Sequence, residues 1–365
     1  MRIAAIGVGG AGGRIVDSMW WDDERRHTSY LGGTCVVDTD RDALESLRAV
    51  PEDRRHAFGL FETDGEGTAG DRTTGIAAIE DDLLAVRRTI DPLVTSDIDA
   101  IVLVGGLAGG TGGGAIAHVA DALAEVYEQP LYAVSVLPAG EDEHAATNTI
   151  RSLRTLASAV DGQLLFDNEA WLGRGETVAD DGEKLNETLA TRLGALFGAG
   201  EAPDSTTVGQ SVVDASEIIN TLSGSEFATL GYGTQTVEMP DDDTDGTLLG
   251  RLRSRFSETE AAEVDEIRAH KAIETTLRRA VRGKLTAECR RDSADRALSV
   301  FAGPPAWLIR DAITDGRRWL EDELQSPEIR SGDVPTPDRE EISVLVLLSG
   351  VTEIPRLDAL EALAK

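Results

Sequence analysis

The chain has 365 residues and a formal net charge of −31 at pH 7, with a sequence pI near 4.4. A chain of this length can bury a large core, and it predicts two domains. So much negative charge opposes binding to nucleic acid or to an anionic membrane surface, because both partners are repelled. Lysine occurs only at Lys184, Lys271, Lys284 and Lys365. Nearly all positive charge is therefore arginine, and this acidic balance is typical of a halophile's cytoplasm, where molar salt shortens the range of charge repulsion to about 3 Å. An ordinary acidic mesophilic protein is the alternative.

The cysteines and the start of the chain indicate the compartment. Cys35 lies in an apolar strand pattern and Cys289 in a distant one, and two cysteines are too few for a disulfide framework or a thiolate metal site. The chain begins directly with a strand pattern, without a charged leader and apolar segment, and no apolar run approaches the roughly 18 residues of a membrane span. We therefore expect a soluble, cytoplasmic protein with no direct membrane insertion.

The first strand pattern leads into a glycine-rich segment that precedes a helical pattern. The segment satisfies GxGxxG at Gly7, Gly9 and Gly12. Asp38 ends the next apolar strand, Thr34 to Val37, where a ribose-binding carboxylate lies in a dinucleotide-binding Rossmann unit. An NAD-dependent oxidoreductase is therefore one alternative for the function.

A second glycine-bearing loop, Asp64 to Asp71, precedes a long helical pattern from Thr73 to Thr89. A third, Gly105 to Gly114, follows the apolar run Ala100 to Val104. Glycines let several backbone N–H groups approach one anion, and a helix start adds free donors and a positive dipole end. A dinucleotide clamp uses one such loop, so three favour a nucleoside triphosphate at the carboxyl edge of a parallel sheet. A tight turn is the alternative for any one cluster.

A Walker A loop requires a lysine after its final glycine. Neither Gly12 nor Gly110 is followed by one. Phosphate binding would therefore depend on backbone N–H groups, with the Thr111 hydroxyl and a Mg²⁺ ion sharing the charge.

Two asparagines have side chains whose chemistry suits contact with a nucleobase. Asn168 follows an apolar strand pattern, and Asn186 lies near the start of a long helical pattern, Asp180 to Phe197. An amide offers both an acceptor and donors, so two amides can match guanine O6, N1 and N2 in a way that adenine cannot reproduce. Either asparagine is alternatively a turn or helix-start residue.

Two carboxylates, Asp214 and Glu217, are candidates for catalysis. Three residues apart at a helix start, they lie on one face and can orient a water molecule or accept its proton. The alternative is purely structural, with Asp214 as an N-cap and Glu217 completing a capping box.

The last third combines strand and helix patterns that suggest a smaller α/β domain. Two segments, Gly198 to Ser205 and Met239 to Thr247, are rich in Gly, Pro and Asp and are interpreted as exposed loops. The expected strands and helices beyond them are Ala297 to Phe301 and Ile342 to Leu348, and Ala261 to Val281 and Pro305 to Leu324.

These motifs together resemble the tubulin/FtsZ superfamily, and specifically its archaeal CetZ branch. Ala108 to Gly114 matches the GGGTGxG signature with alanine in place of the first glycine, and Gly209 to Leu222 resembles the synergy loop. Ser299 to Pro305 and Arg317 to Glu321 resemble CetZ more than bacterial FtsZ. Two positions depart from FtsZ, because Val212 and Arg14 stand where FtsZ has asparagine.

The resemblance implies an α/β fold: a Rossmann-like GTP-binding domain with a parallel sheet at 1–182, a central helix and connection at 183–210, and a smaller C-terminal α/β domain at 211–365. It implies binding of GTP and GDP, with Mg²⁺ held through the phosphates and no metal-binding residues of the chain. The expected function is a GTPase activated by head-to-tail self-assembly into protofilaments that control cell shape. The expected partners are further copies of the chain and other superfamily members. A GTP-binding scaffold without hydrolysis is a further alternative.

The resemblance also assigns roles to individual residues. Asp214 and Glu217 would complete the active site of the neighbouring subunit, and Glu141 would approach the ribose. The expected nucleotide-binding residues are Gly9, Gly10, Ala11, Gly12, Arg14, Asp38, Gly67, Thr68, Ala69, Gly70, Ala108, Gly109, Gly110, Thr111, Gly112, Glu141, Asn168 and Asn186.

Overall fold

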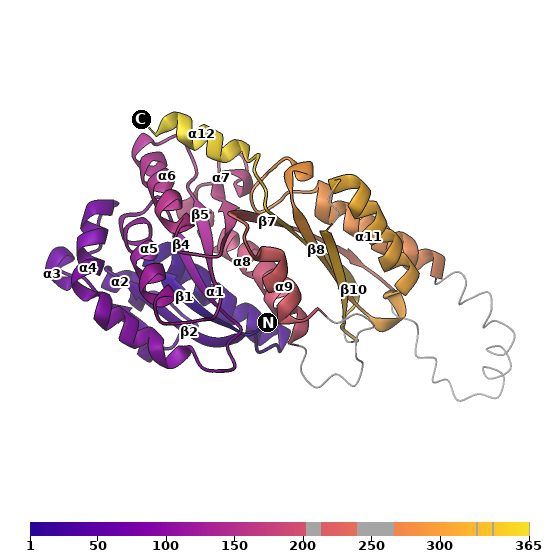
Figure 1. The fold of residues 1–365 in the computed structure, drawn as a ribbon, viewed down its shortest axis with the longest axis horizontal. Helices are drawn as coiled ribbons and strands as arrows, with labels where there is room; N and C mark the ends of the chain where they lie inside the picture. Colours follow the sequence, from indigo (N-terminus) through magenta and orange to yellow (C-terminus); the bar gives the residue numbers. More distant parts are fainter. Residues whose placement is uncertain (202–212, 239–265, 326–327, 338, 365) are drawn as a thin grey trace, which may run out of the picture.

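A computed structural model of the protein describes residues 1–201, 213–238, 266–325, 328–337 and 339–364. Within these residues the strands form one ten-stranded sheet, in the order β3-β2-β1-β4-β5-β6-β7-β10-β8-β9 (Figure 1). The strands are β1 (Ile3–Val8), β2 (Leu31–Asp38), β3 (Arg55–Ala57), β4 (Ala100–Gly106), β5 (Leu131–Leu137), β6 (Gly162–Asp167), β7 (Phe227–Thr236), β8 (Arg296–Gly303), β9 (Glu328–Pro335) and β10 (Glu341–Ser349). The expected α/β class, with a parallel sheet in the first half, is confirmed.

The sheet is continuous between the two halves of the chain. Neighbouring strands from β3 to β7 are parallel, β10 runs antiparallel to both β7 and β8, and β9 is parallel to β8. Only two residue pairs, Gln163 with Phe227 and Leu164 with Ala228, join β6 to β7. The strands of the expected C-terminal unit therefore extend the sheet of the nucleotide-binding half.

Helices cover both faces of the sheet, and each face has its own core. The helices are α1 (Gly9–Arg26), α2 (Arg41–Glu45), α3 (Leu60–Thr63), α4 (Arg72–Ile90), α5 (Gly110–Ala124), α6 (Glu143–Ala157), α7 (Asn168–Trp171), α8 (Val178–Phe197), α9 (Ala215–Leu222), α11 (Arg310–Leu324), α12 (Pro355–Leu363) and a helix over 266–282. One core contains Ile116 of α5 and Leu320 of α11, and the other contains Ile15 of α1 and Leu193 of α8. Alternate residues of the buried strands face the two cores, as a sheet covered on both sides requires.

The structure differs from the sequence expectations at several boundaries. Helices α1 and α5 begin inside the glycine runs, so most of those glycines are helical. The helix expected from Pro305 is split into a short 3₁₀ turn and α11, and Cys289 is buried outside any strand. The expected loop Met239 to Thr247 and positions 202–205 and 209–212 lie outside the described residues. In the described part of the chain, no helix is both long and apolar enough to cross a bilayer.

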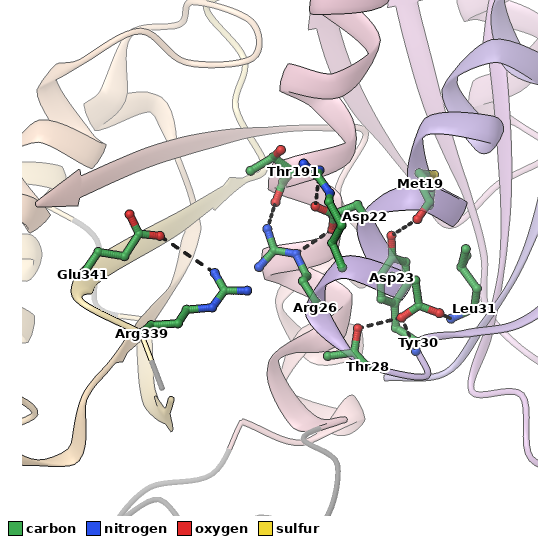
Figure 2. Close-up of polar contacts among 11 residues, drawn as sticks. Met19, Asp22, Asp23, Arg26, Thr28, Tyr30, Leu31, Thr191, Arg339 and Glu341 are labelled. Atoms are coloured by element: carbon green, nitrogen blue, oxygen red, sulfur yellow. Dashed lines mark hydrogen bonds and ion pairs between the residues drawn. The ribbon is translucent and has the colours of Figure 1, made fainter. Parts of the chain in front are cut away.

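A buried ion pair within α1 is also hydrogen-bonded to α8 (Figure 2). Asp22 is almost fully buried and accepts a hydrogen bond from Arg26 Nε at 2.5 Å, while Arg26 Nη2 donates to the carbonyl of Thr191 at 2.8 Å. A Cβ atom at Gly194 of α8 would overlap the Asp22 carboxylate. Glycine at this position therefore allows α8 to pack closely against the Asp22–Arg26 ion pair of α1.

Candidate functional site

A pocket of about 590 Å³ lies at the carboxyl ends of β1, β4, β5 and β6, where α1 and α5 begin. All three glycine-bearing segments contribute to its lining, as the sequence predicted. Every expected nucleotide-binding residue lines the pocket except Gly12, Glu141 and Asn186. The lining members of that set are Gly9, Gly10, Ala11, Arg14, Asp38, Gly67, Thr68, Ala69, Gly70, Ala108, Gly109, Gly110, Thr111, Gly112 and Asn168.

The glycines of the first segment have two different roles. Gly9 has φ of +73°, a left-handed conformation that side chains disfavour, and it turns the chain from β1 into α1 at the pocket. Gly12 lies one helical turn further on, against the backbone of β4, where a Cβ atom would overlap the carbonyl of Val104. Gly12 therefore allows close packing of helix on sheet, and its place in the motif is explained without contact to a ligand.

Two of the helices that begin at the pocket, α1 and α5, have free backbone donors. Neither α1 nor α5 has a side-chain N-cap or an acidic residue in its first turn. In contrast, Asp40, Asp71, Asp142 and Thr177 cap α2, α4, α6 and α8 with side-chain oxygens. The first N–H groups of a helix need acceptors, and the positive dipole end favours an anion. Both helix starts are therefore suited to phosphate oxygens.

Thr111, in the third glycine-bearing segment, contacts both the end of β2 and the second glycine-bearing loop. Its hydroxyl lies 2.7 Å from Thr39 Oγ1, which follows β2, and 3.4 Å from Thr68 Oγ1 in the second glycine-bearing loop. All three threonines are buried. A Cβ atom at Gly110 would overlap Thr68 Oγ1, so glycine is required for the two loops to approach this closely.

The second loop has an unusual backbone and is supported from behind by α6. Ala69 has φ of +50°, a conformation that costs a residue with a side chain about 1 kcal/mol. Asn148 of α6, almost fully buried, donates from Nδ2 to the carbonyls of Gly70 and Ala108, each at 3.0 Å. One amide group therefore holds two pocket loops at a fixed separation. The sequence analysis did not identify Asn148, because nothing in the local pattern distinguishes this residue.

Acidic and basic groups share the pocket. Burial raises the pKa of Asp38 to about 6, although hydrogen bonds from the backbone of Asp40 and Thr39 and the charge of Arg14 oppose the shift. Asp40 and Glu66 also line the pocket, and their backbones form a β-bridge. The position of Asp40, directly after a strand end, is a signal that could have identified it. Carboxylates beside a polyphosphate repel it unless a cation intervenes, and oxygen ligands suit Mg²⁺.

Two further predicted residues lie outside the lining. Glu141 is exposed in the turn between β5 and α6, while Pro138 and Ala139 of the same turn do line the pocket. Val178, the first residue of α8, lines the pocket, and half-buried Asn186 lies about two turns further along that helix.

Asp214 and Glu217 lie at the start of α9. Asp214 is the N-cap, as the structural alternative expected, and its Oδ1 accepts hydrogen bonds from Ser216 Oγ at 2.6 Å and Glu217 N at 3.0 Å. These hydrogen bonds lower the pKa of Asp214. Burial, followed by the charge of Asp214, raises the pKa of Glu217, and Glu217 Oε2 is buried without a hydrogen-bond partner. The surroundings of the two carboxyl groups therefore shift their pKa values in opposite directions, as in enzymes that use one carboxyl group as an acid and another as a base.

These two carboxylates lie far from the pocket of their own chain. Helix α8 spans about 30 Å, at 1.5 Å per residue, from Val178 at the pocket to Phe197. The carbonyl of Phe197 accepts a hydrogen bond from the Met1 ammonium at 2.8 Å, and that ammonium also acts on Asp214. Figure 1 accordingly places the N-terminus beside α9. One chain therefore has the pocket at one end of its sheet and the two acids at the other.

A pocket suited to phosphate groups lies at the carboxyl edge of a mostly parallel sheet. This arrangement is that of a nucleotide-binding α/β protein of Rossmann type. Family models refine it: residues 2–175 match the tubulin/FtsZ family GTPase domain, and residues 175–365 match the C-terminal domain of tubulin-like CetZ. Tubulin-like protein CetZ1 of Haloferax volcanii is 38% identical over 365 residues, covering 100% of this chain and 92% of that protein.

Solved structures agree with this assignment. The GDP-bound monomer of CetZ1 from Haloferax volcanii has a TM-score of 0.86 and 34% identity, covering 100% of this chain and 98% of that one. The GTPγS-bound protofilament of CetZ2 from the same organism has a TM-score of 0.84 and 32% identity, covering 100% and 97%. The chain belongs to the CetZ branch of the tubulin/FtsZ superfamily.

Proposed function

We propose that this protein binds GTP and hydrolyses it in head-to-tail protofilaments, where each subunit completes the active site of the next. The observation that carries the proposal is the placement of the pocket and of Asp214 with Glu217 at opposite ends of one chain. When subunits stack end to end with one orientation, the acids of one approach the pocket of its neighbour. Such an interface does not close on itself and therefore propagates as a filament.

Within the pocket, the free N–H groups of α1 and α5 would bind the phosphate oxygens, and the Thr111 hydroxyl would add a donor. Mg²⁺ would neutralise phosphate charge, with the carboxylates of Asp40 and Glu66 beside it. In the neighbouring site, ionised Asp214 would orient the attacking water, and Glu217, with its raised pKa, would accept the proton.

Asn168 would read the base. Losing hydrogen bonds to a mismatched purine costs about 2 to 4 kcal/mol, so GTP and GDP should bind a few tenfold steps more tightly than ATP. Equal displacement of a fluorescent guanine nucleotide by ATP and GTP would contradict this assignment. Tight binding of NAD would instead support an oxidoreductase.

Membership of the CetZ branch supports a role in the shape of an archaeal cell, with the polymer in the cytoplasm.

The test of shared catalysis is GTP turnover as a function of protein concentration in molar KCl. Turnover per molecule should rise with concentration and reach a plateau as filaments form, because an isolated protomer has an incomplete site. Turnover that is constant per molecule down to high dilution would place all catalytic groups within one chain. GTP binding with filaments but without turnover would identify a scaffold.

A further inference from the structure

One wall of the pocket is built from two segments that follow neighbouring strands. Pro138 and Ala139 come directly after β5, and Asn168 comes directly after β6, and all three line the pocket. This wall contains Asn168, the residue proposed to read the base, and would therefore face the nucleoside rather than the phosphates.

A single guanidinium group joins the two segments from behind. Arg356 Nη2 donates to the carbonyl of Pro138 at 2.6 Å and to the carbonyl of Gly140 at 3.0 Å. Arg356 Nε lies 3.4 Å from Oδ1 of Asp167, the residue immediately before Asn168. Both side chains are largely shielded from water, with 12% of Arg356 and 6% of Asp167 exposed. The contacts are therefore protected from screening by salt.

Arg356 belongs to α12, which lies far along the chain but packs on α6 beside the pocket (Figure 1). Pro355 occupies the first turn of α12, and buried Leu360 anchors the helix in the core. A surface ion pair at 3.1 Å between Arg154 of α6 and Glu361 of α12 adds a second contact between the helices. The last helix thus brings Arg356 to the back of the pocket wall.

The chemistry of this contact requires arginine. Nη2 donates to both carbonyl oxygens, while Nε faces the Asp167 carboxylate as an ion pair without a hydrogen bond. A planar guanidinium holds these two nitrogens in a fixed fork. A lysine ammonium is a single point charge that cannot span these contacts. The hydrogen bond from Gly140 N to Glu169 Oε2 at 2.7 Å also ties the turn to the β6 side.

We propose that Arg356 is a positioning residue for the nucleoside-facing wall, so that the C-terminal helix forms part of the nucleotide site. The inference rests on the proposed guanine nucleotide site and names a determinant of its affinity and base preference. Without Arg356, the turn at Pro138 and Gly140 is no longer held against the end of β6, and the Asp167 carboxylate is left buried without a cation. The wall then no longer presents Asn168 in fixed geometry to the base.

The test separates positioning from charge compensation. Arg356→Gln leaves the Asp167 carboxylate unpaired, which is destabilising, whereas the double variant Arg356→Gln with Asp167→Asn removes that buried charge. Displacement of a fluorescent guanine nucleotide by GDP and by ADP is measured on the full chain in molar KCl. Arg154→Ala is the matched control, because it removes the ion pair between α6 and α12 without touching the wall.

The double variant should regain thermal stability yet bind GDP at least tenfold more weakly than wild type, with a reduced preference for GDP over ADP. Arg356→Lys should also fail to restore binding, and Arg154→Ala should bind GDP as wild type does. Recovery of both stability and GDP affinity in the double variant would overturn the proposal, because Arg356 would then only compensate charge. Failure of the wild type to prefer GDP over ADP would instead refute the guanine site itself.

Discussion

The hydroxyl oxygens of Thr39 and Thr111 lie 2.7 Å apart, although 72 residues separate them in the sequence. The contact joins the end of β2 to the first turn of α5, and Thr68 approaches the same hydroxyl from the second loop at 3.4 Å. Thr111 lines the pocket and Thr39 does not, so the two partners have different roles.

Replacing each of these threonines by the isosteric valine should separate ligand contact from support. Thr111→Val removes the hydroxyl that faces the ligand, and we expect GTP affinity to fall at least tenfold. Thr39→Val should cost about 1 kcal/mol of unfolding free energy while leaving affinity within about threefold, because Thr111 can still donate to the ligand. Competition with a fluorescent guanine nucleotide and thermal melts measure the two effects. Equal losses of affinity would show that Thr111 has no direct contact.

The sequence predicted the glycine segments and strand ends well, because positive φ, helix starts and apolar runs are local properties. It did not predict the packing of Gly12 on Val104, because that contact depends on how closely α1 packs on β4. It missed Asn148 and Arg356, because their contacts join segments distant in the chain. The continuity of the sheet across β6 and β7 rests on two residue pairs, and no local pattern encodes such pairing.

Two glycines of α8 should respond to alanine in opposite directions. Gly182 has nothing within 4 Å of an added Cβ, so Gly182→Ala should stabilise the protein by up to about 1 kcal/mol through helix propensity. Gly194→Ala would force Asp22 and Arg26 apart and should destabilise it by about 2 to 3 kcal/mol. Thermal or denaturant melts of the two variants measure these changes, and a stabilising Gly194→Ala would show that the Asp22–Arg26 ion pair readily rearranges.

Asp38 should make a measurable contribution to pH dependence. Its pKa of about 6 in the folded chain, against 3.8 as the ordinary value, arises from burial, with Asp40 adding to the shift and Arg14 opposing it. The folded state therefore takes up this proton first as pH falls from 7 to 4, and the group's contribution to stability increases over that window. The unfolding free energy of wild type should gain up to about 3 kcal/mol relative to Asp38→Asn. A constant difference between the two proteins from pH 7 to pH 4 would show that Asp38 titrates normally.

Stability should increase with salt because of the charge of −31. Screening shortens the range of repulsion among surface carboxylates from about 30 Å at 0.01 M salt to about 3 Å at 1 M. The melting temperature should therefore rise from low to molar KCl. A melting temperature independent of KCl would show that the acidic surface has no halophilic role.

The shared active site is the central claim, and mixing two inactive variants tests it most directly. Asp214→Asn keeps a good N-cap for α9 but removes the charge, so it should bind GTP normally while turnover falls by about 10². Glu217→Gln should behave in the same way. Thr111→Val retains both acids but binds GTP poorly.

In a mixture, Thr111→Val subunits can supply intact Asp214 and Glu217 to GTP bound by Asp214→Asn subunits. Turnover should therefore exceed the sum of the two proteins measured alone. The control is the same mixture made with the Thr111→Val, Asp214→Asn double variant, which has no acid to supply and should give no recovery. Recovery with Thr111→Val alone is the result that the account predicts, and its absence in mixtures that form filaments would contradict catalysis across the interface.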